Sequence, residues 1–470
     1  MNTEKMTSTA DPPARCEELP GIPRRPDIAG PDIVRHKLVS NSLDELDTLN
    51  HYCFGGCRDM SRQFRILTVN DGSEGEESLF LAAQLMGTDS MVVHYDPSPL
   101  VVERVRRRAE QYGLLGRIRF TSGSLVELLA SLRSKSQLLA VRQGEKEEKA
   151  IEYGPFDYVR CCGAFDRAEN PHDLFELTTR FLKEDGVLGV SCFARYGREP
   201  YRQMQALAKL LDDRRGRTGD TIALLKEFMV FAPTSNWTRM AFDQLSPEIR
   251  RMKDEAFFTE FLREDGFAPS IVQLYDLLDA RLMDIACFAR ETRFMYQPWF
   301  AQNDRKLADV LKDLAPRDIQ AVSEIAWGNI ERHLFWASRG EARTADPGDP
   351  DNIPFFNHFS NMKRSWSTLL RTIPEDGVLT IEISIGEDCF SLTHAWNAVL
   401  RRFIELLDGY KTLGEIALVI REETRGEMGI DEILRTITLF MHGAALEDIL
   451  LLRHKNTPLL PFTASHLRAA

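Results

Sequence analysis

From residue 65 onward, short apolar runs alternate with amphipathic segments, and the alternation repeats five times. Runs of this length are typical of strands buried on both faces, and strands that alternate with helices pair in parallel through right-handed crossovers. The pattern therefore predicts an α/β fold with a doubly wound, Rossmann-like parallel sheet in a domain spanning residues 41–199. The five predicted strands are RILTV, MVVHYD, RIRFTSG, FDYVRCCG and VLGVSCF, and the third helix is SLVELLASL.

The pattern changes on both sides of this domain. Residues 1–40 lack sustained periodicity and are expected to form a mobile arm, whereas residues 200–340 are expected to be a helical substrate or dimerisation domain. Residues 341–364 are a Gly/Pro/Asp-rich linker, and residues 365–458 show a hairpin, three helices and a final strand, the composition of a small winged-helix-like α+β domain. Residues 459–470 are a tail.

Composition narrows the classes of protein that fit. The chain has 470 residues, 43% of them hydrophobic and 28% charged, which is typical of a soluble globular protein of two or three domains. A net charge of −12 argues against sequence-independent binding of nucleic acid. We expect no membrane span and, because the eight cysteines are scattered, a reducing, cytoplasmic location. His51, Cys53 and Cys57 lie close together, but no second pair completes a metal site.

The loop after the first strand is the first candidate binding site. Its residues are Asn70, Asp71, Gly72, Ser73, Glu74 and Gly75, and the carboxyl ends of parallel strands are where such sheets bind ligands. Gly72 and Gly75 would let the backbone approach a ligand at a helix N-terminus. The surrounding carboxylates would repel a phosphate and favour a cationic or zwitterionic ligand, although a purely structural turn also explains the loop.

Two further loops contribute polar residues at the same edge of the predicted sheet. Asp96 ends the second strand, where a carboxylate can accept both hydroxyls of a ribose. Ser124 and Leu125 follow the third strand, where they could lie against the edge of a purine ring. The alternative for Asp96 and for Ser124 is that each caps the helix that follows it.

These fragments, in this order, resemble class I S-adenosylmethionine-dependent methyltransferases, in particular a bacterial protein-lysine-methyltransferase-like branch with helical regulatory and C-terminal winged-helix-like domains. The resemblance covers residues 49–336 in pieces. It rests on LNHYCFGGCRDMSRQFRIL, YDPSPL, SGSLVELL, FDYVRCCGAF, RYGREPYRQMQALAKLL and WGNIERHLFW.

The resemblance implies S-adenosylmethionine as cofactor and a peptide, protein or small-molecule natural product as methyl acceptor. Tyr196 and Asp166 would face the acceptor. The alternatives are that Tyr196 is a plain aromatic residue of a loop and that Asp166 is a surface residue. His333 is expected to be a packed histidine at a helix end. A homodimer is compatible with this branch. The cofactor contacts that the resemblance implies are Asn70, Asp71, Gly72, Gly75, Asp96, Pro97, Ser124, Leu125 and Cys162.

The sequence also departs from the family pattern, and this keeps a second hypothesis open. Relatives carry glycine at three alternate positions of the first loop, and a leucine-histidine-histidine where this chain has Phe165-Asp166-Arg167. The alternative is a methyltransferase-like regulatory or binding subunit with a degenerate cofactor site. A nicotinamide dehydrogenase fits less well because the three-glycine pyrophosphate site is missing. The helix GIDEILRTITLFMHG carries one arginine and two acids, so we expect a protein-docking module and not a DNA reader.

Overall fold

The computed structural model of this chain divides into two compact units, which are described separately. One unit includes Asp27–Arg198, Asp265–Leu379 and His394–Ala470, and contains the central sheet; the other includes Glu199–Glu264 and Thr380–Thr393. The residues that the structure describes are 41–70, 75–123, 155–168, 170–215, 218–242, 246–263, 266–301, 304–340, 343–357, 377–385, 388–444 and 448–464.

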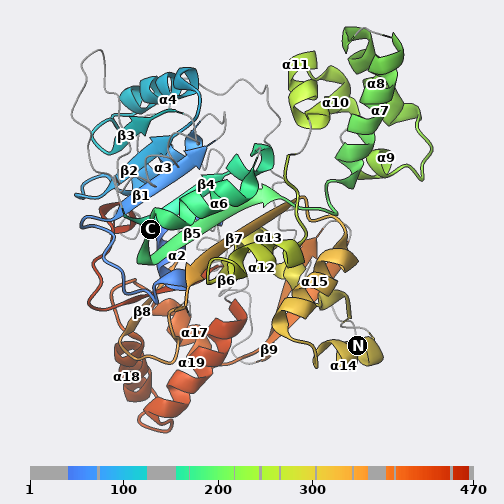
Figure 1. Cartoon of the computed structure of the whole chain (residues 1–470). Helices are drawn as coiled ribbons and strands as arrows, with labels where there is room; N and C mark the ends of the chain where they lie inside the picture. Colours follow the sequence, from blue (N-terminus) through green and yellow to red (C-terminus); the bar gives the residue numbers. More distant parts are fainter. Residues whose placement is uncertain are drawn as a thin grey trace. The chain divides into compact units, whose positions relative to one another are not determined.

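A seven-stranded sheet in the order β3-β2-β1-β4-β5-β7-β6 forms the centre of the larger unit (Figure 1). Strands β1 to β5 pair in parallel, and β7 runs antiparallel to both β5 and β6. The prediction of a doubly wound parallel sheet with five successive strands is therefore confirmed. The strands are β1 Arg65–Asn70, β2 Met91–Tyr95, β3 Ile118–Thr121, β4 Phe156–Cys162, β5 Leu182–Phe193, β6 Met283–Phe288 and β7 Arg332–Arg339.

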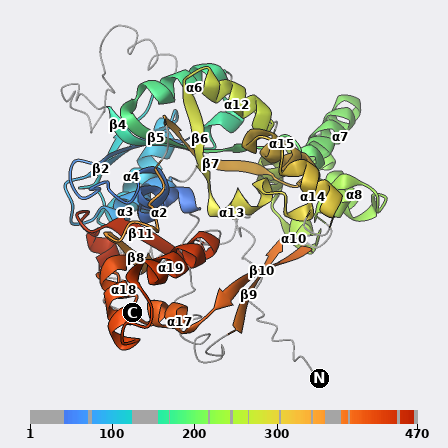
Figure 2. The same cartoon turned by 90° about the horizontal axis from the view of Figure 1, so that it is seen from below.

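Helices cover both faces of the sheet, as the apolar strands require (Figure 2). Side chains alternate along each strand, so Ile66 packs with α2, α3 and α4 on one face, and Leu67 packs with α6 and α12 on the other. The helices on the first face are η1 Ser42–Asp44, α2 Leu46–Cys53, α3 Glu76–Gln84 and α4 Pro99–Gln111; those on the second include α6 Pro171–Arg180 and α12 Ile271–Asp279.

The prediction of a helical domain over residues 200–340 missed two strands. Strands β6 and β7 fall in this stretch and complete the sheet, together with α12, α13 Arg290–Arg293, η5 Phe294–Tyr296, η6 Trp299–Ala301, α14 Arg305–Leu311 and α15 Pro316–Trp327. Strand β7 is buried along most of its length, and a short apolar run of that kind cannot be distinguished from a buried helix by periodicity. Leu282 has φ 54° and separates α12 from β6.

Only Glu199–Glu264 forms a separate helical unit with its own core. The rings of Tyr201, Phe242 and Phe261 contact one another, with the centroid of Tyr201 5.0 and 5.7 Å from those of the two phenylalanines, whose own centroids are 5.2 Å apart. Its helices are α7 Glu199–Arg215, α8 Thr218–Phe231, α9 Trp237–Phe242, α10 Ser246–Arg251, α11 Asp254–Phe257 and the π-helical turn η4 Phe258–Leu262.

The predicted C-terminal elements are present: a hairpin of β9 Gly377–Ile385 and β10 Asp388–Trp396, three helices and a final strand β11 Leu450–His454. The predicted linker, however, contains a further strand, β8 Asn352–Phe356, which pairs antiparallel with β11. Pro354 within this short run weakens its strand signal in the sequence. The three helices are α17 Ala398–Glu405, α18 Leu413–Glu423 and α19 Ile430–Ala444.

Candidate functional site

The carboxyl ends of β1, β2 and β4 lie side by side and bring together four of the predicted cofactor residues. Val69 is in register with Tyr95 on one side and Cys161 on the other, and Asn70 is in register with Cys162. Asn70, Gly75, Asp96 and Cys162 therefore lie at one edge of the sheet. The predicted residues Asp71, Gly72, Ser124 and Leu125 and the third predicted helix lie outside the described residues.

Gly75 is required where the first loop enters helix α3. It has φ 67° and ψ 24°, in the left-handed region that glycine adopts readily and other residues do not. A Cβ atom at this position would lie 2.6 Å from Cγ2 of Val105 and 2.7 Å from its Cγ1. Gly75 therefore lets α3 begin in close contact with α4, which is the packing role of the last glycine in a nucleotide-binding loop.

Asn70, the last residue of β1, is buried in a small polar cluster. Its Nδ2 lies 2.8 Å from Nδ1 of His94, which is also 2.8 Å from Oγ of Ser78. The Ser78 hydroxyl lies 2.6 Å from Oγ1 of Thr68. Burial lowers the pKa of His94 to about 3, so the imidazole is neutral. Oδ1 of Asn70 is buried without a hydrogen-bond partner, so the amide is not fully satisfied by the protein.

Asp96 is fully buried at the end of β2. Its Oδ1 accepts a hydrogen bond of 2.8 Å from the Ser98 amide. Its own amide donates a hydrogen bond of 3.3 Å to the carbonyl of Thr121, the last residue of β3. Asp96 thus shapes the entry to α4, the structural role that the sequence left open. A carboxylate offers about four acceptor positions, so this role is compatible with a ligand contact. Pro97, between these two residues, is exposed.

Cys162 ends β4 and is almost fully buried. Burial raises the pKa of its thiol well above the ordinary value, so the group is a neutral thiol and not a thiolate nucleophile. The following residue, Gly163, has φ 70°, and a Cβ atom there would lie 3.2 Å from Oδ2 of Asp166. The chain therefore turns tightly at the end of β4.

Asp166, a predicted acceptor-facing residue, is buried and held by protein groups on both oxygens. Oδ1 accepts from the Phe193 amide at 2.7 Å, and Oδ2 pairs with Nη2 of Arg332 at 2.6 Å. Burial raises the pKa of this carboxyl, and the nearby Arg332 guanidinium opposes the increase. Asp166 thus ties the end of β4 to β5 and β7, and it is not the surface residue that the sequence suggested.

Arginines missed by the sequence analysis surround the end of β5. The guanidinium carbons of Arg198 and Arg332 lie 3.9 and 4.6 Å from the centroid of the Phe193 ring. Tyr196, the other predicted acceptor-facing residue, is half-buried in the turn that joins β5 to Arg198. A Cβ atom at Gly197 would lie 2.1 Å from the Ile330 carbonyl, so this turn is packed directly against the segment that leads into β7.

His333 is packed, as expected, but it lies on β7 and not at a helix end. Its Nδ1 is 2.5 Å from the Tyr296 hydroxyl and its Nε2 is 2.9 Å from the Pro269 carbonyl. Burial lowers the pKa of His333 to about 4. Both ring nitrogens have partners, so the side chain is a structural group.

The segment LNHYCFGG, which carried part of the family resemblance, is a docking site for the C-terminal strand. Nδ1 of His51 accepts a hydrogen bond of 3.0 Å from the Leu452 amide. A Cβ atom at Gly56, which has φ 71°, would lie 2.8 Å from the Leu452 carbonyl, so only glycine fits there. The contacts of this segment therefore attach it to β11, and Nδ1 of His51 takes part in that attachment. No group of three or more potential metal ligands lies among the described residues.

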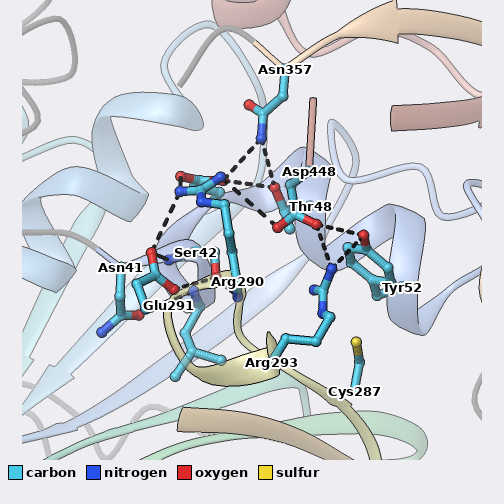
Figure 3. A network of polar contacts seen from close by, with 12 residues as sticks. Asn41, Ser42, Thr48, Tyr52, Cys287, Arg290, Glu291, Arg293, Asn357 and Asp448 are labelled. Atoms are coloured by element: carbon cyan, nitrogen blue, oxygen red, sulfur yellow. Dashed lines mark hydrogen bonds and ion pairs between the residues drawn. The ribbon is translucent and has the colours of Figure 1, made fainter. Parts of the chain in front are cut away.

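A buried ionic network strengthens this attachment (Figure 3). Oδ1 of Asp448 accepts hydrogen bonds from the Tyr52 hydroxyl at 2.5 Å and from Nη1 of Arg293 at 2.7 Å. Nearby, Nη2 of Arg290 pairs with Oε1 of Glu45 at 3.0 Å. Asp448 and Glu45 are fully buried, so their charges depend on these partners.

No helix among the described residues has the length and apolar character needed to cross a membrane.

Comparisons with solved structures find the same fold in another protein. The structure of PKMT2 from Rickettsia typhi superposes with a TM-score of 0.57 and 13% identity, covering 89% of this chain and 76% of that chain. The same protein in complex with AdoHcy gives a TM-score of 0.58, also at 13% identity, with coverages of 89% and 77%.

Sequence comparison alone is less informative. An uncharacterised protein of Synechococcus sp. is 26% identical over 211 residues, which are 43% of this chain and 48% of the relative, so the chain spans about half the length of that relative. No protein-family model matches. The strand order, the antiparallel β7 and the superposition agree on one conclusion: this chain has a Rossmann-like α/β fold, which it shares with PKMT2 from Rickettsia typhi.

Proposed function

We propose that this protein is an S-adenosylmethionine-dependent methyltransferase that binds its cofactor at the carboxyl ends of β1, β2 and β4. The observation that carries the proposal is the placement of Asp96. A fully buried carboxylate ends the strand next to β1, whose loop leads through Gly75 into α3. Within a fold shared with a structure that holds AdoHcy, this is the arrangement that would accept the ribose hydroxyls.

The remaining residues of this edge suit a positively charged ligand. When bound, the cofactor supplies an activated methyl group, and the protein must only align the acceptor with it and exclude water. Gly75 would keep the entrance to α3 free of side chains, and Oδ1 of Asn70 would provide an unused buried acceptor. Cys162, in register with Asn70, would form the floor between β1 and β4. Asp71, Gly72, Pro97, Ser124 and Leu125 stay predictions for the cofactor contacts.

We place the acceptor beside the turn after β5. Tyr196 is half-buried there and could line the acceptor pocket, whereas Asp166 is committed to Arg332 and to the Phe193 amide. Asp166 would therefore act by holding the ends of β4 and β5 in place. A peptide, a protein or a small natural product is the class of acceptor that we infer, and a hydroxyl or amine acceptor would need a general base in addition.

A second function is favoured by one observation. The first loop departs from the three-glycine pattern of the family that it resembles, and it begins at Asn70, whose side chain is packed into the His94 cluster. A binding or regulatory subunit would tolerate this change without turnover. Release of S-adenosylhomocysteine, measured with candidate acceptors after binding has been established, distinguishes the two functions, because a regulatory subunit binds the cofactor and releases no product.

Calorimetric titration with S-adenosylmethionine and S-adenosylhomocysteine tests the proposal. We expect micromolar binding by the full chain. Asp96→Ala should weaken it by about tenfold to a hundredfold, because a lost hydrogen bond to a charged group is worth roughly 1.5–3 kcal/mol. Asp313→Asn, at an exposed position of the same unit, is the matched control and should bind as the wild type does. Absence of binding by the wild-type chain at millimolar ligand would exclude the proposed site.

A further inference from the structure

A polar hollow lies at the opposite end of the sheet from the proposed cofactor site. It is formed where β1, β4 and β5 begin, and its volume is about 400 Å³. This is large enough for a small anionic group but too polar for an apolar ligand. The lining residues are Arg58, Asp59, Arg62, Gln63, Phe64, Arg65, Pro155, Asp157 and Lys183.

The hollow is basic although the protein as a whole is acidic. Four of its lining residues are cationic and two are acidic, in a chain whose net charge is −12. The acidic residue Asp157 is buried and already neutralised: Nζ of Lys183 lies 2.8 Å from each of its oxygens, and Nη1 of Arg58 lies 3.7 Å from Oδ1. Arg58 also contacts Asp185, outside the lining. These contacts fix two of the cations in place.

The other two cationic residues, Arg62 and Arg65, are not held by Asp157 through their guanidinium groups. Oδ1 of Asp59 accepts from both the amide and the hydroxyl of Ser61, and its Oδ2 is 3.9 Å from Nε of Arg62, whose side chain is 83% exposed. The Arg65 amide donates to Asp157, whereas its guanidinium makes no ion pair or hydrogen bond with any described residue. Within the part of the chain that the structure describes, the donors of Arg62 and Arg65 are therefore largely unused.

A strained backbone conformation lies between these two arginines and fixes the turn that carries them. Gln63, between them in the sequence, has φ 51°, an uncommon conformation for a residue other than glycine. The conformation is stabilised by a hydrogen bond of 2.6 Å from the Gln63 amide to Oδ1 of Asp89. Strained conformations of this kind are retained where the surrounding structure fixes them, and they are frequent at binding sites.

We propose that this hollow binds a doubly charged oxyanion, a phosphate group in particular, through the guanidinium groups of Arg62 and Arg65. Arginine binds phosphate oxygens in a bidentate manner, and two guanidiniums on a fixed turn are suited to one tetrahedral dianion. Lys183 and Arg58, held by Asp157, add positive potential behind them. The site is independent of the proposed methyltransferase function because it lies at the other end of the strands.

Titration of the full chain with inorganic phosphate at constant ionic strength, followed by ³¹P NMR line broadening and calorimetry, tests the proposal. We expect saturable binding that weakens at least tenfold in Arg62→Gln/Arg65→Gln. The matched control Arg421→Gln/Arg435→Gln removes two exposed arginines from α18 and α19 and should leave the affinity unchanged. Binding of S-adenosylhomocysteine should be the same in all three proteins, which separates this site from the cofactor site and reports that the variants are folded.

Equal phosphate affinity in the wild type and the Arg62/Arg65 variant, or no saturable binding by the wild type, would overturn the proposal. Two further ligands identify the source of the phosphate group once binding is found. A phosphoserine peptide that binds more tightly than inorganic phosphate would indicate a protein partner, and tighter binding of pyrophosphate would indicate a small phosphorylated molecule. Either result supports the assigned chemistry.

Discussion

Replacing Gly75 by alanine should destabilise the sheet unit more than the same replacement at Gly113. Both glycines have positive φ, 67° and 69°, so the new methyl group meets the same backbone strain in each case. They differ in their surroundings: the added Cβ would lie 2.6 Å from Val105 at position 75, whereas nothing lies within 4 Å at position 113. The comparison isolates the effect of crowding between α3 and α4.

The magnitude follows from these two contributions. The left-handed conformation costs an L-residue about 1–2 kcal/mol, which is the whole effect expected for Gly113→Ala. Crowding against the fully buried Val105 should add about 1–3 kcal/mol at Gly75, because a side chain at 0% exposure cannot move away. We therefore expect a loss in the free energy of unfolding of about 2–5 kcal/mol for Gly75→Ala.

Urea unfolding followed by circular dichroism and tryptophan fluorescence measures both losses. Val105→Ala in the Gly75→Ala background should recover part of the stability, and the double-mutant cycle should give a favourable coupling of about 1–3 kcal/mol. Equal losses for Gly75→Ala and Gly113→Ala, or a coupling near zero, would refute the conclusion that Gly75 is required for the contact between α3 and α4.

Two further variants test the buried charges. Asp448→Asn should lower the free energy of unfolding by about 3–5 kcal/mol, because the buried charge of Arg293 would lose its ion pair with Asp448. The exposed Asp431→Asn is the control and should change the free energy of unfolding little in the same urea titration. A similar loss in both variants would contradict the stabilising role of the buried ion pair. Burial raises the pKa of Glu324 to about 7, so the folded state holds its proton more tightly than the unfolded state and loses stability as the pH rises from about 4.5 to 7. Glu324→Gln should therefore be more stable than the wild type by about 2–3 kcal/mol at pH 8 and nearly equal to it at pH 4.5. The exposed Glu427→Gln is the control, and its stability relative to the wild type should not change with pH in this way. A stability difference for Glu324→Gln that does not depend on pH would contradict the raised pKa of Glu324.

The repeated strand and helix pattern was sufficient to predict the fold class, since each of β1 to β5 is a short apolar run with a helical pattern nearby. The same reasoning failed at β7. Its apolar run HLFWA follows α15 after only a few residues, and nothing local distinguishes a strand buried between β5 and β6 from the end of a helix. The position of β7, antiparallel between β5 and β6, depends on tertiary contacts, and it extends the sheet beyond the five predicted strands.

The candidate site was predictable only where position along the chain determines position in space. Asp96 directly follows β2 and Gly75 directly precedes α3, so their location at the edge of the sheet could be inferred from the predicted strands and helices alone. The partner of Asp166 could not, because Arg332 is 166 residues away and reaches it only through the missed strand β7. The network around Asp448 likewise depends on Tyr52 and Arg293, which no sequence spacing connects.

Hydrogen–deuterium exchange with and without S-adenosylhomocysteine tests the central claim most directly, because it locates the ligand on the chain. The account predicts slower exchange in peptides that cover Val69–Ser78 and Tyr95–Ser98, at the carboxyl ends of β1 and β2. Peptides that cover Arg58–Arg65, at the opposite end of the sheet, should exchange at the same rate with and without the ligand. Protection elsewhere, with unchanged exchange at the ends of β1 and β2, would contradict the assigned cofactor site.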